Sequence, residues 1–162
     1  MERQGADCCY HCAHSAPVAV IDKGIPELPP QVRISAALDG ILVLVAEDEA
    51  VIALDVAMAI CDAGGQVAGP AASIKQALAL ISQLPIGAAI LDVNLSDGDI
   101  TLVAEILLAA GIPTILQTGV GLPADLIAQF PNLTVQMKPC ASESLVAQLA
   151  LVIANRQAVE GS

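Results

Sequence analysis

Short apolar runs alternate five times with helical segments along this chain, and this alternation constrains the fold more than any other feature. The clearest run, residues 88–91, is apolar at every position and ends abruptly at Asp92, where the turn formers Asn94, Ser96, Asp97 and Gly98 begin. A run that is apolar throughout is typical of a strand buried on both faces of a parallel sheet. Five such runs predict strands at residues 41–45, 66–69, 88–92, 113–117 and 133–137.

Helical periodicity and helix-ending residues define the segments between these strands. Gly64 and Gly65 end the first segment and Ser73 can cap the second, as helix boundaries require. The helices are predicted at residues 49–63, 73–84, 100–110, 123–129 and 142–157. Strands that alternate with helices form a parallel sheet covered on both faces, and right-handed crossovers leave few topologies. We therefore expect an α/β fold of flavodoxin type, a doubly wound (βα)5 sheet with strand order 2-1-3-4-5.

The composition sets the domain organisation and excludes some partners. The 162 residues are 56% hydrophobic but only 1% aromatic, so the core must be aliphatic. Residues 1–39 are interrupted by Pro17, Gly24, Pro26 and further prolines, which predicts an irregular extension before a domain at 40–157 and a tail at 158–162. The net charge of -11 and the lack of a basic cluster argue against nucleic acid as a partner.

Hydropathy raises the question of a membrane segment. Every long apolar run is broken by a charged residue, Gln or Pro before it reaches the length of a membrane span, as Glu105 and Pro113 break residues 100–116. The N-terminal residues lack the apolar centre of a signal peptide. These patterns predict a cytoplasmic protein without a membrane partner.

Three cysteines and two histidines gather near the N-terminus. This cluster consists of Cys8, Cys9, His11, Cys12 and His14. Such residues can bind zinc, but their spacing matches no standard zinc finger or ribbon and no second ligand pair follows. A loosely held arm is therefore the preferred interpretation, with a metal site as the alternative.

A polar residue of distinct chemistry follows four of the predicted strands. Glu47 and Asp48 follow the first strand, Asp92 the third, Thr118 the fourth and Lys138 the fifth. The carboxyl ends of parallel strands share one edge, and the first and third strands are neighbours at the switch point of this topology. We expect the three carboxylates to converge there, although each residue alone could simply cap a helix or occupy a turn.

Three converging carboxylates need a positive charge near them. At an effective dielectric of 20, one pair about 4 Å apart costs roughly 4 kcal/mol, which a proton or a cation must relieve. A small set of oxygen ligands suits Mg²⁺, while Lys138 supplies a fixed positive charge and Thr118 a hydroxyl donor. A carboxylate in these surroundings is arranged to attack phosphorus and form an aspartyl phosphate.

Four motifs in order resemble the receiver domain of two-component response regulators, in its stand-alone form. They are VLVAEDE at 43–49, ILDVNL at 90–95, IPTILQTG at 112–119 and MKP at 137–139. The resemblance implies that Asp92 accepts the phosphoryl group, Thr118 is the switch hydroxyl and Lys138 is the paired lysine. It also implies a Mg²⁺ site made by Glu47, Asp48, Asp92 and the backbone carbonyl of Asn94.

The resemblance also implies partners. A histidine kinase or a histidine phosphotransfer protein would supply the phosphoryl group, and the chain would catalyse only its own phosphorylation and dephosphorylation. We expect no output domain, because the sequence ends a few residues beyond the last predicted helix. Signalling would then use a downstream protein target, or the domain would act as a phosphate sink.

Some residues depart from the family pattern. Val135 stands where the family usually has Tyr or Phe, which puts an aromatic switch coupled to Thr118 in doubt. Ser96 replaces a common proline in the loop after Asp92. The short segment between the fourth and fifth strands predicts a reduced fourth helix. Helix 49–63 has few polar residues, which indicates either a partner or homodimer face or harmless exposed alanines.

Two other functions remain as alternatives. One is a receiver-like interaction module that works without phosphorylation, as the missing aromatic suggests. The other is an aspartate-nucleophile phosphatase of haloacid-dehalogenase type, which requires Asp-x-Asp after its first strand. Here the candidate nucleophile follows the third strand, and Asn94 occupies the second position.

Overall fold

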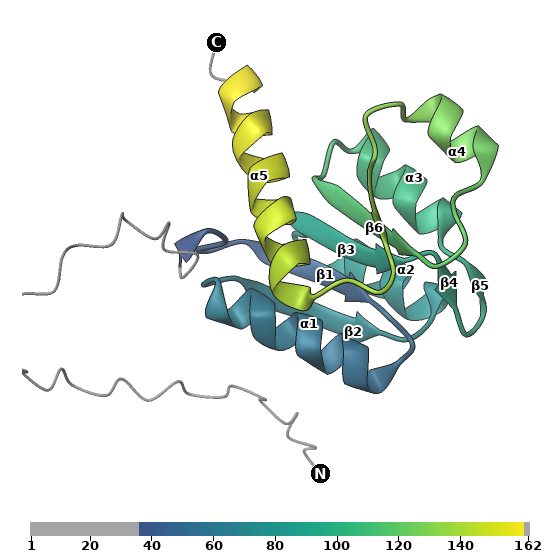
Figure 1. The fold of residues 1–162 in the computed structure, drawn as a ribbon, viewed down its shortest axis with the longest axis horizontal. Coiled ribbons are helices and arrows are strands. Elements are labelled where there is room, and N and C mark those ends of the chain that lie inside the picture. The colour runs from purple at the N-terminus through teal and green to yellow at the C-terminus, as the bar shows by residue number, and fades with distance from the viewer. Residues whose placement is uncertain (1–35, 161–162) are drawn as a thin grey trace, which may run out of the picture. The chain divides into compact units, whose positions relative to one another are not determined.

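The computed structural model describes residues 36–160, and its main element is one five-stranded parallel sheet (Figure 1). The strand order is β2-β1-β3-β6-β7, and every neighbouring pair is parallel. In chain order of the main strands this is 2-1-3-4-5, so the predicted flavodoxin-like topology is confirmed.

The bounds of the elements agree closely with the sequence pattern. The strands of the sheet are β1 (Leu42–Ala46), β2 (Gln66–Ala71), β3 (Ala88–Asp92), β6 (Thr114–Thr118) and β7 (Thr134–Met137). The helices are α1 (Ala50–Asp62), α2 (Ile74–Gln83), α3 (Thr101–Ala109), α4 (Ala124–Gln129) and α5 (Ser142–Glu160). A small antiparallel hairpin that the pattern did not predict, β4 (Asn94–Leu95) with β5 (Gly98–Asp99), follows β3.

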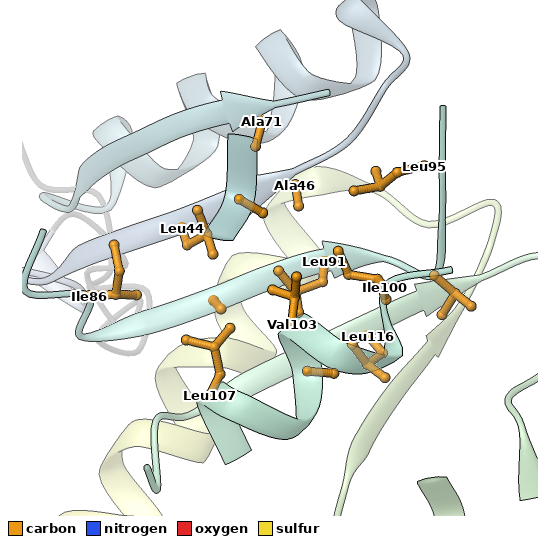
Figure 2. Close-up of a cluster of buried hydrophobic side chains, with 14 of the residues drawn as sticks. Leu44, Ala46, Ala71, Ile86, Leu91, Leu95, Ile100, Val103, Leu107 and Leu116 are labelled. Atoms are coloured by element: carbon orange, nitrogen blue, oxygen red, sulfur yellow. The ribbon is translucent and has the colours of Figure 1, made fainter. Parts of the chain in front are cut away.

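Alternate residues of the buried strands divide the core between the two faces of the sheet. Leu44, Leu91 and Leu116 belong to the cluster under α2 and α3, and Figure 2 shows them beside Val103 and Leu107 of α3. The opposite face packs against α1 and α5 (Figure 1). Its cluster includes Val43, Val45, Ile90 and Ile115 from the sheet, with Val56, Ile60, Leu145 and Leu149 from the helices.

Three details differ from the expected bounds. Strand β2 continues through Pro70, which is tolerated because β2 lies at the edge of the sheet and needs no hydrogen bond from that nitrogen. Helix α5 continues to Glu160, into the predicted tail, since no helix-disfavouring residue precedes Gly161. Leu38 is fully buried and its N–H donates to the Ala63 carbonyl, so packing begins before residue 40.

No helix in the described part of the chain is both long enough and apolar enough to cross a membrane. Most of the predicted extension, including the cysteine and histidine cluster, lies outside the described residues. The predicted domain boundaries therefore stay predictions.

Candidate functional site

The predicted residues reach the carboxyl edge of the sheet because four strands end there. Strand β1 ends at Ala46, directly before Glu47 and Asp48, and β3 ends at Asp92 itself. Strand β7 ends one residue before Lys138, whose N–H donates to the Thr118 carbonyl at the end of β6. The sheet register thus places acidic, hydroxyl and basic groups at the ends of four adjacent strands.

Lys138 joins the two buried carboxylates of this edge. Its Nζ donates to Glu47 Oε2 at 2.8 Å and to Asp92 Oδ2 at 2.7 Å, and both contacts are salt bridges. Glu47 and Asp92 are 3% and 8% exposed, so little water screens this triad. Burial opposes the charge of the ammonium, but the hydrogen bonds and charges of Asp92 and Glu47 outweigh it and raise the pKa of Lys138 above its ordinary value.

The remaining carboxylate oxygens of the triad accept backbone hydrogen bonds. Glu47 Oε1 accepts the N–H of Glu49 at 3.0 Å, and Asp92 Oδ1 accepts the N–H of Asn94 at 3.2 Å. Each carboxylate is therefore held by its own loop on one side and by Lys138 on the other. The site has a fixed geometry before any ligand arrives.

Glu47, Asp48 and Asp92 form the acidic cluster of the site. Each offers one carboxylate oxygen, and these three oxygens lie within 4.8 Å of one another. Asp48 is exposed, so one side of the cluster faces solvent and keeps room for water ligands. Oxygen donors beside open water fit Mg²⁺, which binds few protein ligands and retains several waters.

Thr118 lies at the same edge, yet its hydroxyl bonds to its own loop. The Oγ1 atom donates to the Gly121 carbonyl at 2.8 Å and accepts the N–H groups of Val120 and Gly121 at 3.2 and 3.1 Å. The side chain is fully buried, whereas Val120 is 88% exposed. Its proposed role toward a phosphoryl group stays a prediction.

Two residues near Asp92 were not singled out by the sequence pattern. Gln117 is 3% exposed and is the register partner of Asp92 in the β3–β6 pair. Asp97, in the turn of the hairpin after Asp92, bonds to the first turn of α2. The strand pattern could have indicated Gln117, but a turn sequence such as Asp97-Gly98 gives no sign of a distant partner.

A groove lies beside the acidic cluster, between α1 and the segment that follows β7. Lys138, Pro139 and Cys140 line one side of it and α1 the other, with Gln117 also lining it. On α1 the large apolar side chains Val51, Leu54 and Met58 are 81%, 61% and 58% exposed. Small alanines alone therefore do not explain the hydropathy of α1, and a partner face on this helix stays a prediction.

Comparison with known proteins found relatives among solved structures. No family model matches the chain, and no curated protein matches its sequence. The solution structure of SdrG from Sphingomonas melonis Fr1 is 31% identical, with a TM-score of 0.60, and the match covers 73% of this chain and 98% of SdrG.

Two further matches carry the family name. The response regulator PhyR from Brucella abortus is 26% identical with a TM-score of 0.63, over 78% of this chain but only 53% of PhyR. A response regulator receiver protein from Sinorhizobium medicae WSM419, at 24% identity and a TM-score of 0.61, shares the fold over 72% of this chain and 96% of its own. The chain thus spans about half the length of PhyR and nearly all of the two shorter proteins. With its acidic cluster and paired lysine in place, this chain belongs to the receiver domains of response regulators.

Proposed function

We propose that this chain accepts a phosphoryl group on Asp92 from a phosphohistidine of a kinase or a phosphotransfer protein. The observation that carries this proposal is the Lys138 ammonium bound to both Asp92 and Glu47, beside a cluster whose donors fit Mg²⁺. A carboxylate held in this way is a fixed nucleophile whose surroundings can accept additional negative charge.

The reaction follows from these positions. An oxygen of Asp92 attacks the phosphorus, the phosphorus–nitrogen bond of phosphohistidine breaks, and the imidazole leaves with the electron pair and takes a proton. Mg²⁺, when bound, neutralises charge on the phosphoryl oxygens. Lys138 already donates a hydrogen bond to Asp92. Its ammonium can therefore bind an oxygen of the phosphoryl group without a large movement.

The surroundings of Asp92 indicate how a donor approaches. Asp92 is only 8% exposed, so the donor histidine must come close to the edge of the sheet. The groove next to Lys138 offers exposed Val51, Leu54 and Met58 as an apolar contact for such a protein. We infer that a helical partner with an apolar face occupies this groove during transfer.

Signalling would follow from a change in the segment after β6. The Thr118 hydroxyl donates its one proton to the Gly121 carbonyl, so it must give up that bond if it is to donate to a phosphoryl oxygen. This would change the segment that carries the exposed Val120. A downstream protein that binds one arrangement of this segment better than the other would read the change.

The direct test is labelling with acetyl phosphate and Mg²⁺. We expect intact mass measurement to show one added phosphoryl group that hydroxylamine removes, as it does from an acyl phosphate. The Asp92→Asn variant should gain none, while Asp99→Asn, which changes an exposed carboxylate of the same loop, should label like the wild type. Equal labelling of the wild type and Asp92→Asn would exclude Asp92. Profiling against the histidine kinases of the host then identifies the donor.

A second candidate is an interaction module that works without phosphorylation. It is favoured by Val135, which replaces the usual aromatic residue, and by a Thr118 hydroxyl that is fully used within its own loop. On this alternative, beryllofluoride with Mg²⁺ would leave the affinity for the downstream partner unchanged. A change in that affinity would favour the phosphorylation-dependent function.

A further inference from the structure

The hairpin β4–β5 directly follows Asp92 and needs support from outside itself. Only two residue pairs join its strands, Asn94 with Asp99 and Leu95 with Gly98. A hairpin of this size is not stable alone in water. Leu95 is buried in the core cluster and anchors one strand, but all other residues of the hairpin are exposed, so burial does not fix the turn at Ser96 and Asp97.

The turn of the hairpin is fixed by hydrogen bonds to the start of α2. Asp97 Oδ1 accepts the N–H of Ile74 at 2.7 Å, and Asp97 Oδ2 accepts the N–H of Lys75 at 3.3 Å. Ser96 Oγ donates to the Ala72 carbonyl at 2.7 Å. Gly98 lies close to Ile74 as well: a Cβ there would be 3.3 Å from Ile74 Cδ1, and its φ of +142° favours glycine.

Asp97 is a second cap of α2, besides the local cap that Ser73 provides. Ser73 Oγ accepts the N–H of Gln76 at 3.2 Å, as an N-cap serine normally does. Asp97 satisfies the two earlier N–H groups from 23 and 22 residues away. The hydrogen bond from Ile74 is the main cause that lowers the pKa of Asp97, so the carboxylate is charged at neutral pH and suits the positive end of the helix.

Helix α2 is a firm anchor for this connection. It packs on β1 and β2, and its own residue Ala77 is fully buried. The segment between the two anchors, from Asp92 at the end of β3 to Ser96, is short and includes Asn94. A Mg²⁺ ligand set requires nearly ideal octahedral geometry, so the position of this segment determines how well it can bind the ion.

We propose that Asp97 is a positioning residue, which holds the metal-binding segment Asp92–Asn94 in place through its hydrogen bonds to the first turn of α2. The proposal rests on the proposed function, because it assumes that this segment binds Mg²⁺. It assigns Asp97 no contact with the ion or the phosphoryl group.

The test compares two caps of the same helix. Mg²⁺ is titrated into the full chain and followed by the NMR shifts of the Asp92–Asn94 amides, in the wild type, Asp97→Ala and Ser73→Ala. Loss of a residue that orients metal ligands typically weakens metal binding 10- to 100-fold, and we expect about tenfold for Asp97→Ala. Ser73→Ala removes a cap from α2 but leaves the hairpin bonds, so its Kd should stay within about twofold of the wild type.

A conservative variant and a second measurement keep the test decisive. Asp97→Asn retains an amide oxygen that can accept the Ile74 N–H, so its Kd should lie between those of the wild type and Asp97→Ala. If the alanine variant unfolds, Asp97→Asn compared with Ser73→Ala makes the same test. Amide hydrogen exchange should accelerate across the hairpin in Asp97→Ala and not in Ser73→Ala. Equal Kd values for Asp97→Ala and Ser73→Ala would overturn the proposal alone, whereas a wild type that does not bind Mg²⁺ would overturn the proposed function as well.

Discussion

The carboxylates that follow β1 and end β3, and the hydroxyl that ends β6, reach the same edge of the sheet but are held in different ways. Glu47 and Asp92 are joined across separate segments by Lys138, at 2.8 and 2.7 Å. The Thr118 hydroxyl bonds within its own loop, to Val120 and Gly121. One part of the site is therefore held by bonds between strands, and the other by bonds within a single loop.

This difference separates chemistry from response. The Lys138 triad is already arranged around Asp92, so on the proposed function the groups that would stabilise a phosphoryl group need little rearrangement. The loop after Thr118 has hydrogen bonds to the Thr118 hydroxyl that do not involve the side chains of the triad, and it carries the exposed Val120. On the proposed function, such a receiver would react at the triad and signal through the loop after Thr118.

The largest expected effect comes from removing the shared cation. Lys138→Met should slow phosphorylation by acetyl phosphate about 100-fold, because a positioned charge that stabilises the transition state is lost. It should also lower the free energy of unfolding by roughly 1–3 kcal/mol, since two adjacent buried carboxylates lose their partner. Labelling rates and urea unfolding at neutral pH measure both effects.

The matched control for that variant is Lys75→Met. Lys75 is an exposed lysine on α2 whose backbone N–H, and not its side chain, bonds to Asp97. It should leave the labelling rate and the stability close to the wild type. If Lys138→Met also labelled at the wild-type rate, the triad would be structural, and the contrast between the two parts of the site would fail.

Removing the Thr118 hydroxyl should lower stability but have a smaller effect on the labelling rate. Thr118→Ala leaves the N–H groups of Val120 and Gly121 and the Gly121 carbonyl without their partner, which should cost about 1–3 kcal/mol of stability. The labelling rate should stay within about threefold, because the hydroxyl does not bond to Asp92. Thr118→Ser, which keeps the hydroxyl, should recover most of the stability. A loss of rate as large as in Lys138→Met would contradict the separation.

The sheet and the triad were predictable because both depend on local patterns. Apolar runs such as residues 88–91 identify buried strands, and the topology then brings Glu47, Asp92 and Lys138 to one edge without further information. The short α4 was also predicted, from the few residues available between β6 and β7. These features follow from the pattern of a few neighbouring residues or from the topology of the whole sheet.

The features that were missed depend on contacts between distant loops. Asp97 reads as a turn residue, and its partners Ile74 and Lys75 lie more than twenty residues away. The direction of the Thr118 hydroxyl is equally hidden, because a threonine after a strand can bond to its own loop or face the site. Exposure of Leu54 and Met58 was ambiguous for a similar reason, since an apolar helix does not reveal which of its faces is covered.

The smallest expected effect is a pH dependence that belongs to the triad alone. The pKa of Lys138 is raised in the folded protein, so its contribution to stability is fully present below the ordinary lysine pKa of 10.5 and is lost as the pH rises through the folded value. The test is urea unfolding from pH 8 to 12. The wild type should have a higher free energy of unfolding than Lys138→Met, and this difference should shrink only above about pH 10.5. Thr118→Ala should keep the alkaline loss of the wild type, because its loop contains no titrating group. If the advantage over Lys138→Met stayed constant across this range, the ammonium would not be held by the two carboxylates in solution.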